Sequence, residues 1–210
     1  NTVANSPFTS SEPVSELAAG EQLFEEMELG GTVNFIAFRQ AVAGYNRIKE
    51  KSKPILTLID FSKPSTEKRF FVFDMEKKKL LYSSVVAHGR NSGENYATSF
   101  SNQYGSYKSS LGFYLTENTY QGGNGYSLIL NGLEKGINDK AKARSIVVHG
   151  APYANPSVAA SGRLGRSLGC PALPTKLARP IINTIKDGSV MFIYANNPHY
   201  LAQSNILHKN

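Results

Sequence analysis

The sequence of 210 residues contains only one cysteine and no run of about 18 apolar residues. A single cysteine excludes an intrachain disulfide, so the thiol is either a buried apolar group or a reactive one. The lack of a long apolar run leaves no helix that could span a bilayer. Hydrophobic residues make up 40% of the chain, which excludes a largely disordered protein. A chain of this length buries about 70% of its unfolded surface, so its core needs neither disulfides nor metals.

Basic residues are absent from the first 30 positions, which hold six acidic residues. Residues 138–190, in contrast, contain eight basic and two acidic residues, and the net charge of the chain is +7. No long Lys/Arg run or interleaved aromatic motif accompanies this basic excess, so nucleic acid is not the expected partner. We expect a substrate that carries a carboxylate.

Histidine pairs with metal-ligand spacing are also missing. The four histidines form no H-x-x-x-H or H-E-x-x-H pair, the arrangement that places two zinc ligands on one helix face. The sequence therefore gives little support to a zinc peptidase.

The first 16 residues are rich in Ser, Thr, Asn and Pro, and the chain does not begin with Met. This composition suits a processed N-terminus after a removed export signal. A short acidic helix is expected around residues 17–27, ending before two glycines, and a second helix at 35–48 with Asn34 as its N-cap.

From residue 55 onward, short apolar segments alternate with turns, which is typical of strands. The expected strands are 55–61, 69–74, 80–88, 112–120, 126–131, 145–149 and 190–195. A helix is expected at 175–187, where Pro180 should delay its start or kink it. The predicted fold class is therefore mainly β (α+β).

The only cysteine ends a polar, glycine-rich loop, G-R-L-G-R-S-L-G-C-P at 162–171. A thiol of pKa about 8.5 is only a few per cent thiolate at neutral pH, so a cysteine nucleophile needs an imidazole or cationic neighbour. His149, at the end of an apolar strand, is the candidate base, and Arg163 and Arg166 are candidate cations. Gly169 gives the backbone freedom to aim its own amide and that of Cys170 at one oxyanion.

Each of these residues also has a structural interpretation. A lone cysteine is more often inert than reactive, a strand-end histidine is usually structural, and Ser167 and the two arginines could belong to a solvated turn. His88 ends the strand at 80–88 and either faces the same cleft or lies on the surface. The joint pattern favours chemistry, because Cys170 lies in a polar loop and not within an apolar run.

The motif V-V-H-G at 147–150, followed by S-L-G-C at 167–170 with seventeen residues between His149 and Ser167, resembles the active-site signature of L,D-transpeptidases. These enzymes cross-link bacterial peptidoglycan. The segment S-S-L-G-F-Y at 109–114 resembles the beginning of a strand in this family. Further sequence segments within residues 55–195 resemble its murein L,D-transpeptidase-like branch. The resemblance implies packed mixed sheets, with a flexible N-terminus and small helical extension at 1–54 and a catalytic domain at 55–210.

The resemblance also implies a mechanism without metal or organic cofactor. Cys170 attacks the acyl carbonyl of a tetrapeptide stem, His149 manages the protons, and the carbonyl of Gly150 orients the imidazole. An amine of a neighbouring stem then resolves the thioester. The same Cys-His pair could transfer the acyl group to water, as an L,D-carboxypeptidase or a cell-wall amide hydrolase. A wall-binding module with a vestigial cysteine is a further alternative.

The implied partners are peptidoglycan stem peptides and carbapenem inhibitors, and the implied location is the cell envelope, in the periplasm or cell wall. Many members of the family carry Arg two positions after the cysteine, where this chain has Ala172. We expect Arg166 or Arg163 to make the substrate contact instead, with Ser167 and His88 as further substrate-binding candidates.

Overall fold

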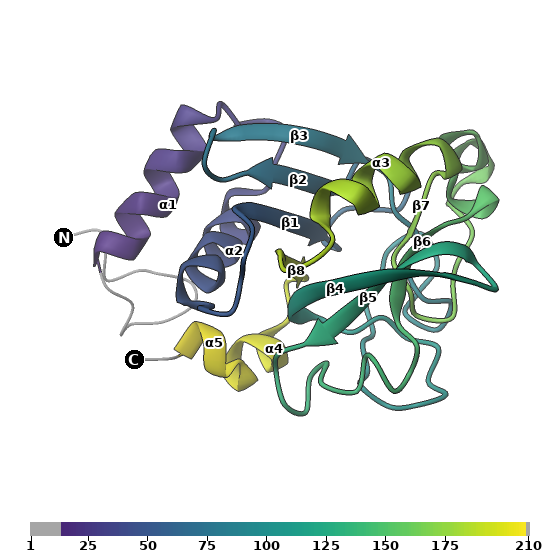
Figure 1. Ribbon diagram of the computed structural model, residues 1–210. Helices are drawn as coiled ribbons and strands as arrows, with labels where there is room; N and C mark the ends of the chain where they lie inside the picture. The colour runs from purple at the N-terminus through teal and green to yellow at the C-terminus, as the bar shows by residue number, and fades with distance from the viewer. Residues whose placement is uncertain (1–13, 209–210) are drawn as a thin grey trace.

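The computed structural model describes residues 14–208, and the expected flexible N-terminus lies mostly outside this range. The helices, shown in Figure 1, are α1 (Val14–Glu26), α2 (Phe35–Arg47), the 3-10 helices η2 (Pro152–Ala154) and η3 (Pro156–Ser161), α3 (Thr175–Ile185), α4 (Pro198–Gln203) and α5 (Asn205–His208). The strands are β1 (Ile55–Asp60), β2 (Phe70–Asp74), β3 (Lys79–Ser84), β4 (Gly112–Gly122), β5 (Gly125–Gly132), β6 (Val147–Gly150), β7 (Ala172–Leu173) and β8 (Val190–Tyr194).

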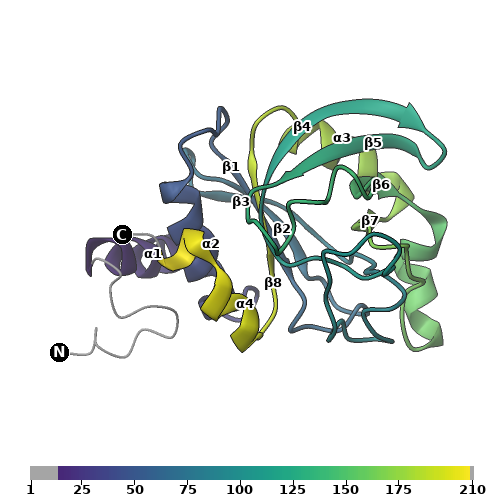
Figure 2. The ribbon, with the colours of Figure 1, turned by 90° about the horizontal axis from the view of Figure 1, so that it is seen from below.

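Within the described residues, the eight strands form one mixed sheet in the order β3-β2-β1-β8-β4-β5-β6-β7. The pairs β1–β8 and β6–β7 are parallel, and the other neighbours are antiparallel. The β4–β5 hairpin curves away from β1–β3 (Figure 2), and beyond β3 two bridges, Ala87 to Ala172 and Gly89 to Ser167, bring the sheet edges together. The mainly β class is confirmed, and its packed mixed sheets are one continuous sheet that nearly closes into a barrel.

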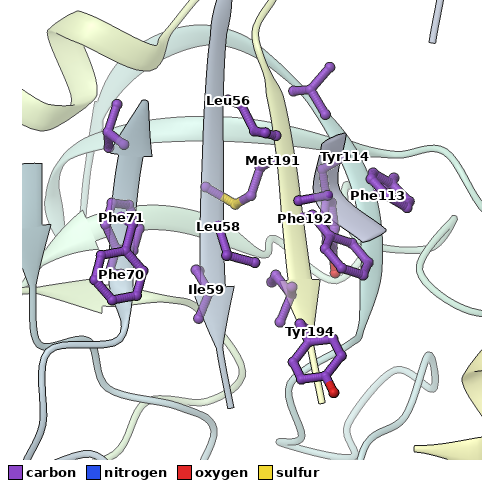
Figure 3. Close-up of a cluster of buried hydrophobic side chains, with 14 of the residues drawn as sticks. Leu56, Leu58, Ile59, Phe70, Phe71, Phe113, Tyr114, Met191, Phe192 and Tyr194 are labelled. Carbon is purple, nitrogen blue, oxygen red and sulfur yellow. The ribbon is translucent and has the colours of Figure 1, made fainter. Parts of the chain in front are cut away.

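The core lies where β1, β2, β4 and β8 meet (Figure 3). The rings of Phe113 on β4 and Phe192 on β8 stack with centroids 4.2 Å apart. Full burial of a side chain of this size stabilises the fold by roughly 1.5–3 kcal/mol. This core fixes the strands from which the loops around the cysteine extend.

Helix α2 is part of the same core. Its N-cap is Asn34, whose Oδ1 accepts a hydrogen bond from the N–H of Ala37 at 3.1 Å, which confirms the predicted cap. Every residue from Ala37 to Tyr45 is buried. Gly44 contacts the ring of Phe113 so closely that a Cβ there would lie 2.0 Å from a ring atom. Glycine at this position therefore lets the helix approach the sheet.

Several elements differ from their expected bounds. The strand expected at 80–88 ends as β3 at Ser84, because the following residues leave β2 and bridge to the segment around β7. Strand β7 and the helices α4 and α5 were not predicted. Helix α3 begins at Thr175 with Pro180 inside it, so the proline does not delay its start, although its missing N–H removes one helical hydrogen bond. None of the helices between residues 14 and 208 is long and apolar enough to cross a membrane.

Candidate active site

Cys170 lies at the end of the glycine-rich loop and packs against the beginning of β6. Its Sγ accepts a hydrogen bond from the N–H of Val147 at 3.4 Å, and it lies 3.5 Å from the carbonyl oxygen of Ser145. The residue is 8% exposed, and its thiol is free. Burial raises the pKa of the Cys170 thiol, although the Val147 N–H and the charge of Arg144 oppose the shift. The thiol is therefore protonated at neutral pH, and its activation requires a base.

His149 belongs to β6, between two strands. It pairs with Ser127 of β5 and with Ala172 of β7, which fixes its backbone on both sides. Its Nδ1 lies 2.9 Å from the carbonyl oxygen of Gly150, the contact that the family resemblance implies. Because a carbonyl only accepts, Nδ1 is the donor in this contact, and Nε2 is the basic nitrogen of the neutral imidazole in this tautomer.

One cavity of about 370 Å³ contains both Cys170 and His149. Among the predicted site residues, the structure also places Arg166 and Ser167 on its wall. The remaining lining residues are Asn124, Arg144, Ser145, Ile146, Tyr153 and Leu168. Sulfur, imidazole and cationic groups thus share one solvent-accessible space, which is the arrangement that acyl transfer by a thiol needs.

Ser167 closes the turn that presents the cysteine. Its Oγ donates to the carbonyl of Cys170 at 2.6 Å and accepts from the N–H of Gly169 at 3.1 Å. The sequence predicted that the amides of Gly169 and Cys170 both face an oxyanion, but the Gly169 N–H is bound to Ser167. Within residues 14–208, the Cys170 N–H has no hydrogen-bond acceptor, so it is the available donor of the two.

Arg163 and Arg166 share one acidic partner in the loop at 89–110. Arg163 Nε lies 2.9 Å from Oε2 of Glu94, and Arg166 NH1 lies 3.3 Å from Oε1. The Glu94 side chain is 75% exposed, so each ion pair contributes about 1 kcal/mol or less. Arg166 lines the cavity and Arg163 does not. Ala172 is fully buried in β7, so an arginine would not fit at this position without rearrangement.

His88 neither faces the cavity nor lies on the surface, so both expectations for it are wrong. It is 1% exposed, its Nδ1 accepts from the Arg69 guanidinium at 2.8 Å, and its Nε2 donates to the carbonyl of Gly93 at 3.1 Å. Burial, reinforced by the charge of Arg69, lowers the pKa of His88 to about 4. Its backbone carbonyl accepts a hydrogen bond from the N–H of Ser167 at 2.9 Å. His88 therefore supports the cysteine loop without lining the cavity.

Two titratable cavity residues, Arg144 and Tyr153, were not singled out from the sequence. Arg144 precedes β6, and Tyr153 follows His149 by four residues. Burial, with a further contribution from the nearby Cys170, raises the pKa of Tyr153 to about 12. The only sequence feature that could have identified these two residues is that both lie within a few positions of V-V-H-G. This feature alone does not separate cavity residues from exposed ones. Among the described residues, no group of three or more His, Cys, Asp or Glu is placed to hold a metal.

The chain is similar to solved structures of three L,D-transpeptidases. L,D-transpeptidase 3 from Mycobacterium tuberculosis, in complex with a faropenem-derived adduct, is 17% identical, with 68% of this chain and 60% of that chain covered and a TM-score of 0.41. An L,D-transpeptidase from Mycobacterium smegmatis is 13% identical, with 68% and 59% covered and a TM-score of 0.41. One from Stackebrandtia nassauensis is 14% identical, with 90% and 82% covered and a TM-score of 0.40.

The chain thus spans 59% and 60% of the two mycobacterial proteins. No curated protein is significantly similar to this sequence. The family model of the L,D-transpeptidase catalytic domain matches residues 30–194, which is more than half of the chain and includes both His149 and Cys170. The protein therefore belongs to the L,D-transpeptidase catalytic domain family.

Proposed function

We propose that this protein is a peptidoglycan L,D-transpeptidase that transfers an acyl group through a thioester on Cys170. One observation carries the proposal: Cys170 and His149 line the same cavity, and His149 uses Nδ1 for the Gly150 carbonyl. This leaves Nε2 as the basic nitrogen for the thiol proton. Membership in the family supports the choice of peptidoglycan as substrate.

In the acylation step, the Cys170 thiol gives its proton to Nε2 of His149, and Sγ attacks the acyl carbonyl of a tetrapeptide stem. The tetrahedral intermediate collapses with cleavage of the C–N bond to the terminal D-amino acid, whose amine takes the proton from His149. A thioester remains on Cys170. In the second step, an amine of a neighbouring stem attacks the thioester, loses a proton to His149, and the sulfur leaves as the regenerated thiol.

The remaining cavity residues have supporting roles in this proposal. The Cys170 N–H, which has no acceptor among the described residues, donates to the oxyanion of each intermediate. Arg166 attracts the carboxylate of the stem, while Arg163 helps to hold Glu94, the partner of Arg166. Ser167 fixes the turn. Because peptidoglycan lies outside the cytoplasm, we further propose that the protein acts in the cell envelope after export.

Incubation with purified tetrapeptide muropeptides, followed by mass analysis of the products, tests the proposal. Cross-linked dimers are expected; loss of the terminal residue without dimers would show hydrolysis by the same residues. Cys170→Ser and His149→Ala should each lower turnover by about 10³-fold or more, because residues of one nucleophilic unit lose activity together. His199→Ala is the matched control, since His199 lies outside this cavity.

The alternative of a vestigial cysteine needs a separate measurement. Alkylation of Cys170 by iodoacetamide is compared in the folded and the denatured protein. The proposal would be contradicted if Cys170 is alkylated in the denatured protein but not in the folded one, and if the folded protein makes no product from muropeptides.

A further inference from the structure

Arg144 lies three residues before the first residue of β6 and lines the cavity that contains Cys170. Its guanidinium is held in place by hydrogen bonds to a segment far away in the sequence, residues 101–110. NH1 donates to the carbonyl of Ser101 at 3.0 Å and to Oγ of Ser110 at 2.9 Å, and NH2 donates to Oγ of Ser106 at 3.1 Å and to the carbonyl of Lys108 at 2.8 Å. Both terminal nitrogens are therefore fully engaged, and this group is a fixed one rather than a free binder of substrate carboxylates.

The same guanidinium packs against the backbone that presents the cysteine. A Cβ built on Gly169 would lie 3.0 Å from the carbonyl oxygen of Lys108 and 3.4 Å from NH2 of Arg144. Arg144 and one of its acceptors thus contact the residue directly before Cys170. A change in the position of residues 101–110 would therefore move the groups that pack against the cysteine loop.

Arg144 also differs in charge environment from the other cavity arginine. Arg166 shares the carboxylate of Glu94, whereas the acceptors of Arg144 are hydroxyls and carbonyls, and within residues 14–208 it has no carboxylate partner. A neutral acceptor set leaves the positive charge uncompensated, and a fixed positive charge beside a buried thiol favours the thiolate. Burial lowers the pKa of Arg144 and raises the pKa of Cys170, and in each case the charge of the other group opposes the shift.

We propose that Arg144 is a positioning residue of this active site, which holds residues 101–110 against the cysteine loop and supplies the fixed positive charge beside Cys170. The inference rests on Cys170 as the nucleophile of the proposed function. It assigns the cation of the site to the residue before the histidine strand, where the sequence had suggested Arg166 or Arg163.

Three variants separate the two parts of this proposal. Arg144→Gln removes the charge, Arg144→Lys keeps the charge but loses the planar fork, and Lys140→Gln is the matched control, an exposed lysine whose loss changes the net charge equally. His149, Tyr153 and Arg166, the other titratable groups on the cavity wall, are unchanged in all three. The rate of Cys170 alkylation by iodoacetamide is measured as a function of pH on the folded proteins, with thermal unfolding as the check on folding.

The midpoint of the alkylation profile should rise by about one pH unit in Arg144→Gln, and it should stay at the wild-type value in Arg144→Lys and Lys140→Gln. With muropeptides, Arg144→Lys should lower kcat about tenfold with KM within about twofold, because the loop loses its support but the binding groups remain. An unchanged midpoint in Arg144→Gln overturns the charge role, and full kcat in Arg144→Lys overturns the loop role.

If Arg144→Lys does not fold, Ser106→Ala tests the loop role in its place, because it removes one acceptor of Arg144 and leaves the charge. It should lower kcat severalfold without moving the alkylation midpoint, and wild-type kcat would contradict the proposal. Alkylation requires no muropeptide. If the midpoint shifts in Arg144→Gln but the wild-type protein forms no product from muropeptides, the proposed function is refuted and this inference stands. If the wild-type protein forms product but the midpoint does not shift, the inference is refuted and the proposed function stands.

Discussion

Replacement of Gly169 by alanine tests how tightly the cysteine loop is packed. Gly169 has a φ of +126°, a conformation that L-residues rarely adopt. A Cβ at this position would lie 2.8 Å from Cδ1 of Ile146 and 3.0 Å from the carbonyl oxygen of Lys108. The isoleucine methyl can rotate away, but the backbone oxygen belongs to the segment that Arg144 holds. The loop must therefore shift to accept the methyl group.

Gly162→Ala is the control that separates backbone strain from crowding. Gly162 has a similar φ of +111°, yet nothing lies within 4 Å of the position that a methyl group would take there. The backbone conformation alone should cost about 1–2 kcal/mol in both variants. Crowding should add about 1–3 kcal/mol in Gly169→Ala only. The free energy of unfolding should thus fall by about 1–2 kcal/mol in Gly162→Ala and by about 2–5 kcal/mol in Gly169→Ala.

Urea unfolding, followed by circular dichroism, measures both free energies, and the rate of Cys170 alkylation reports on the site. Gly169→Ala should alter this rate, because the shift occurs beside the cysteine, whereas Gly162→Ala should keep it. Equal loss of stability in the two variants would refute the argument that Gly169 is needed for close packing.

Three further predictions concern the site and its support. A carbapenem should acylate Cys170, because its strained amide presents the same electrophile to the sulfur; intact-protein mass spectrometry should find an adduct that Cys170→Ser lacks, and an active enzyme without adduct would contradict access to the cavity. Stability should fall as the pH drops from about 6.5 toward 4, because the folded state keeps His88 neutral (pKa about 4) while the unfolded state protonates it near 6.5. At pH 4.5 the free energy of unfolding should be lower by about 2.5 kcal/mol, and this loss should be absent from His88→Gln when both proteins are unfolded by urea. An equal loss in both proteins would exclude His88 as the cause. Arg166→Ala should raise KM more for a stem with a free carboxylate than for an amide-capped stem; an equal rise would mean that Arg166 only shapes the loop.

The elements that could be predicted from the sequence depend on local patterns. The apolar face of α2 and its cap at Asn34 follow from residues within a few positions of each other. The buried strands β1 and β8 likewise read as short apolar runs bounded by turn residues. His149 and Cys170 were expected to act together, because their motifs resemble the active-site signature of a family in which these two residues share one site.

The unpredicted elements depend on contacts between distant segments. Strand β7 has only two residues, Ala172 and Leu173, and exists because β6 and the bridge at Ala87 supply its partners. The burial of His88 away from both the cleft and the surface was not predicted, because it depends on Arg69, which directly precedes β2. A histidine that follows an apolar run has the same sequence signature whether it is buried or exposed.

The charge of the site illustrates why composition alone could not name the effective cation. The basic excess of residues 138–190 includes Arg163 and Arg166, which precede the cysteine by only a few positions. Glu94, which lies outside that segment and approaches only through folding, offsets part of their positive charge. Arg144 has neutral acceptors, and one of its nitrogens lies against Gly169. The field at a buried thiol depends on which cations keep an uncompensated charge nearby, so it is a property of the pairing of acids and bases in the fold and not of their number in the chain.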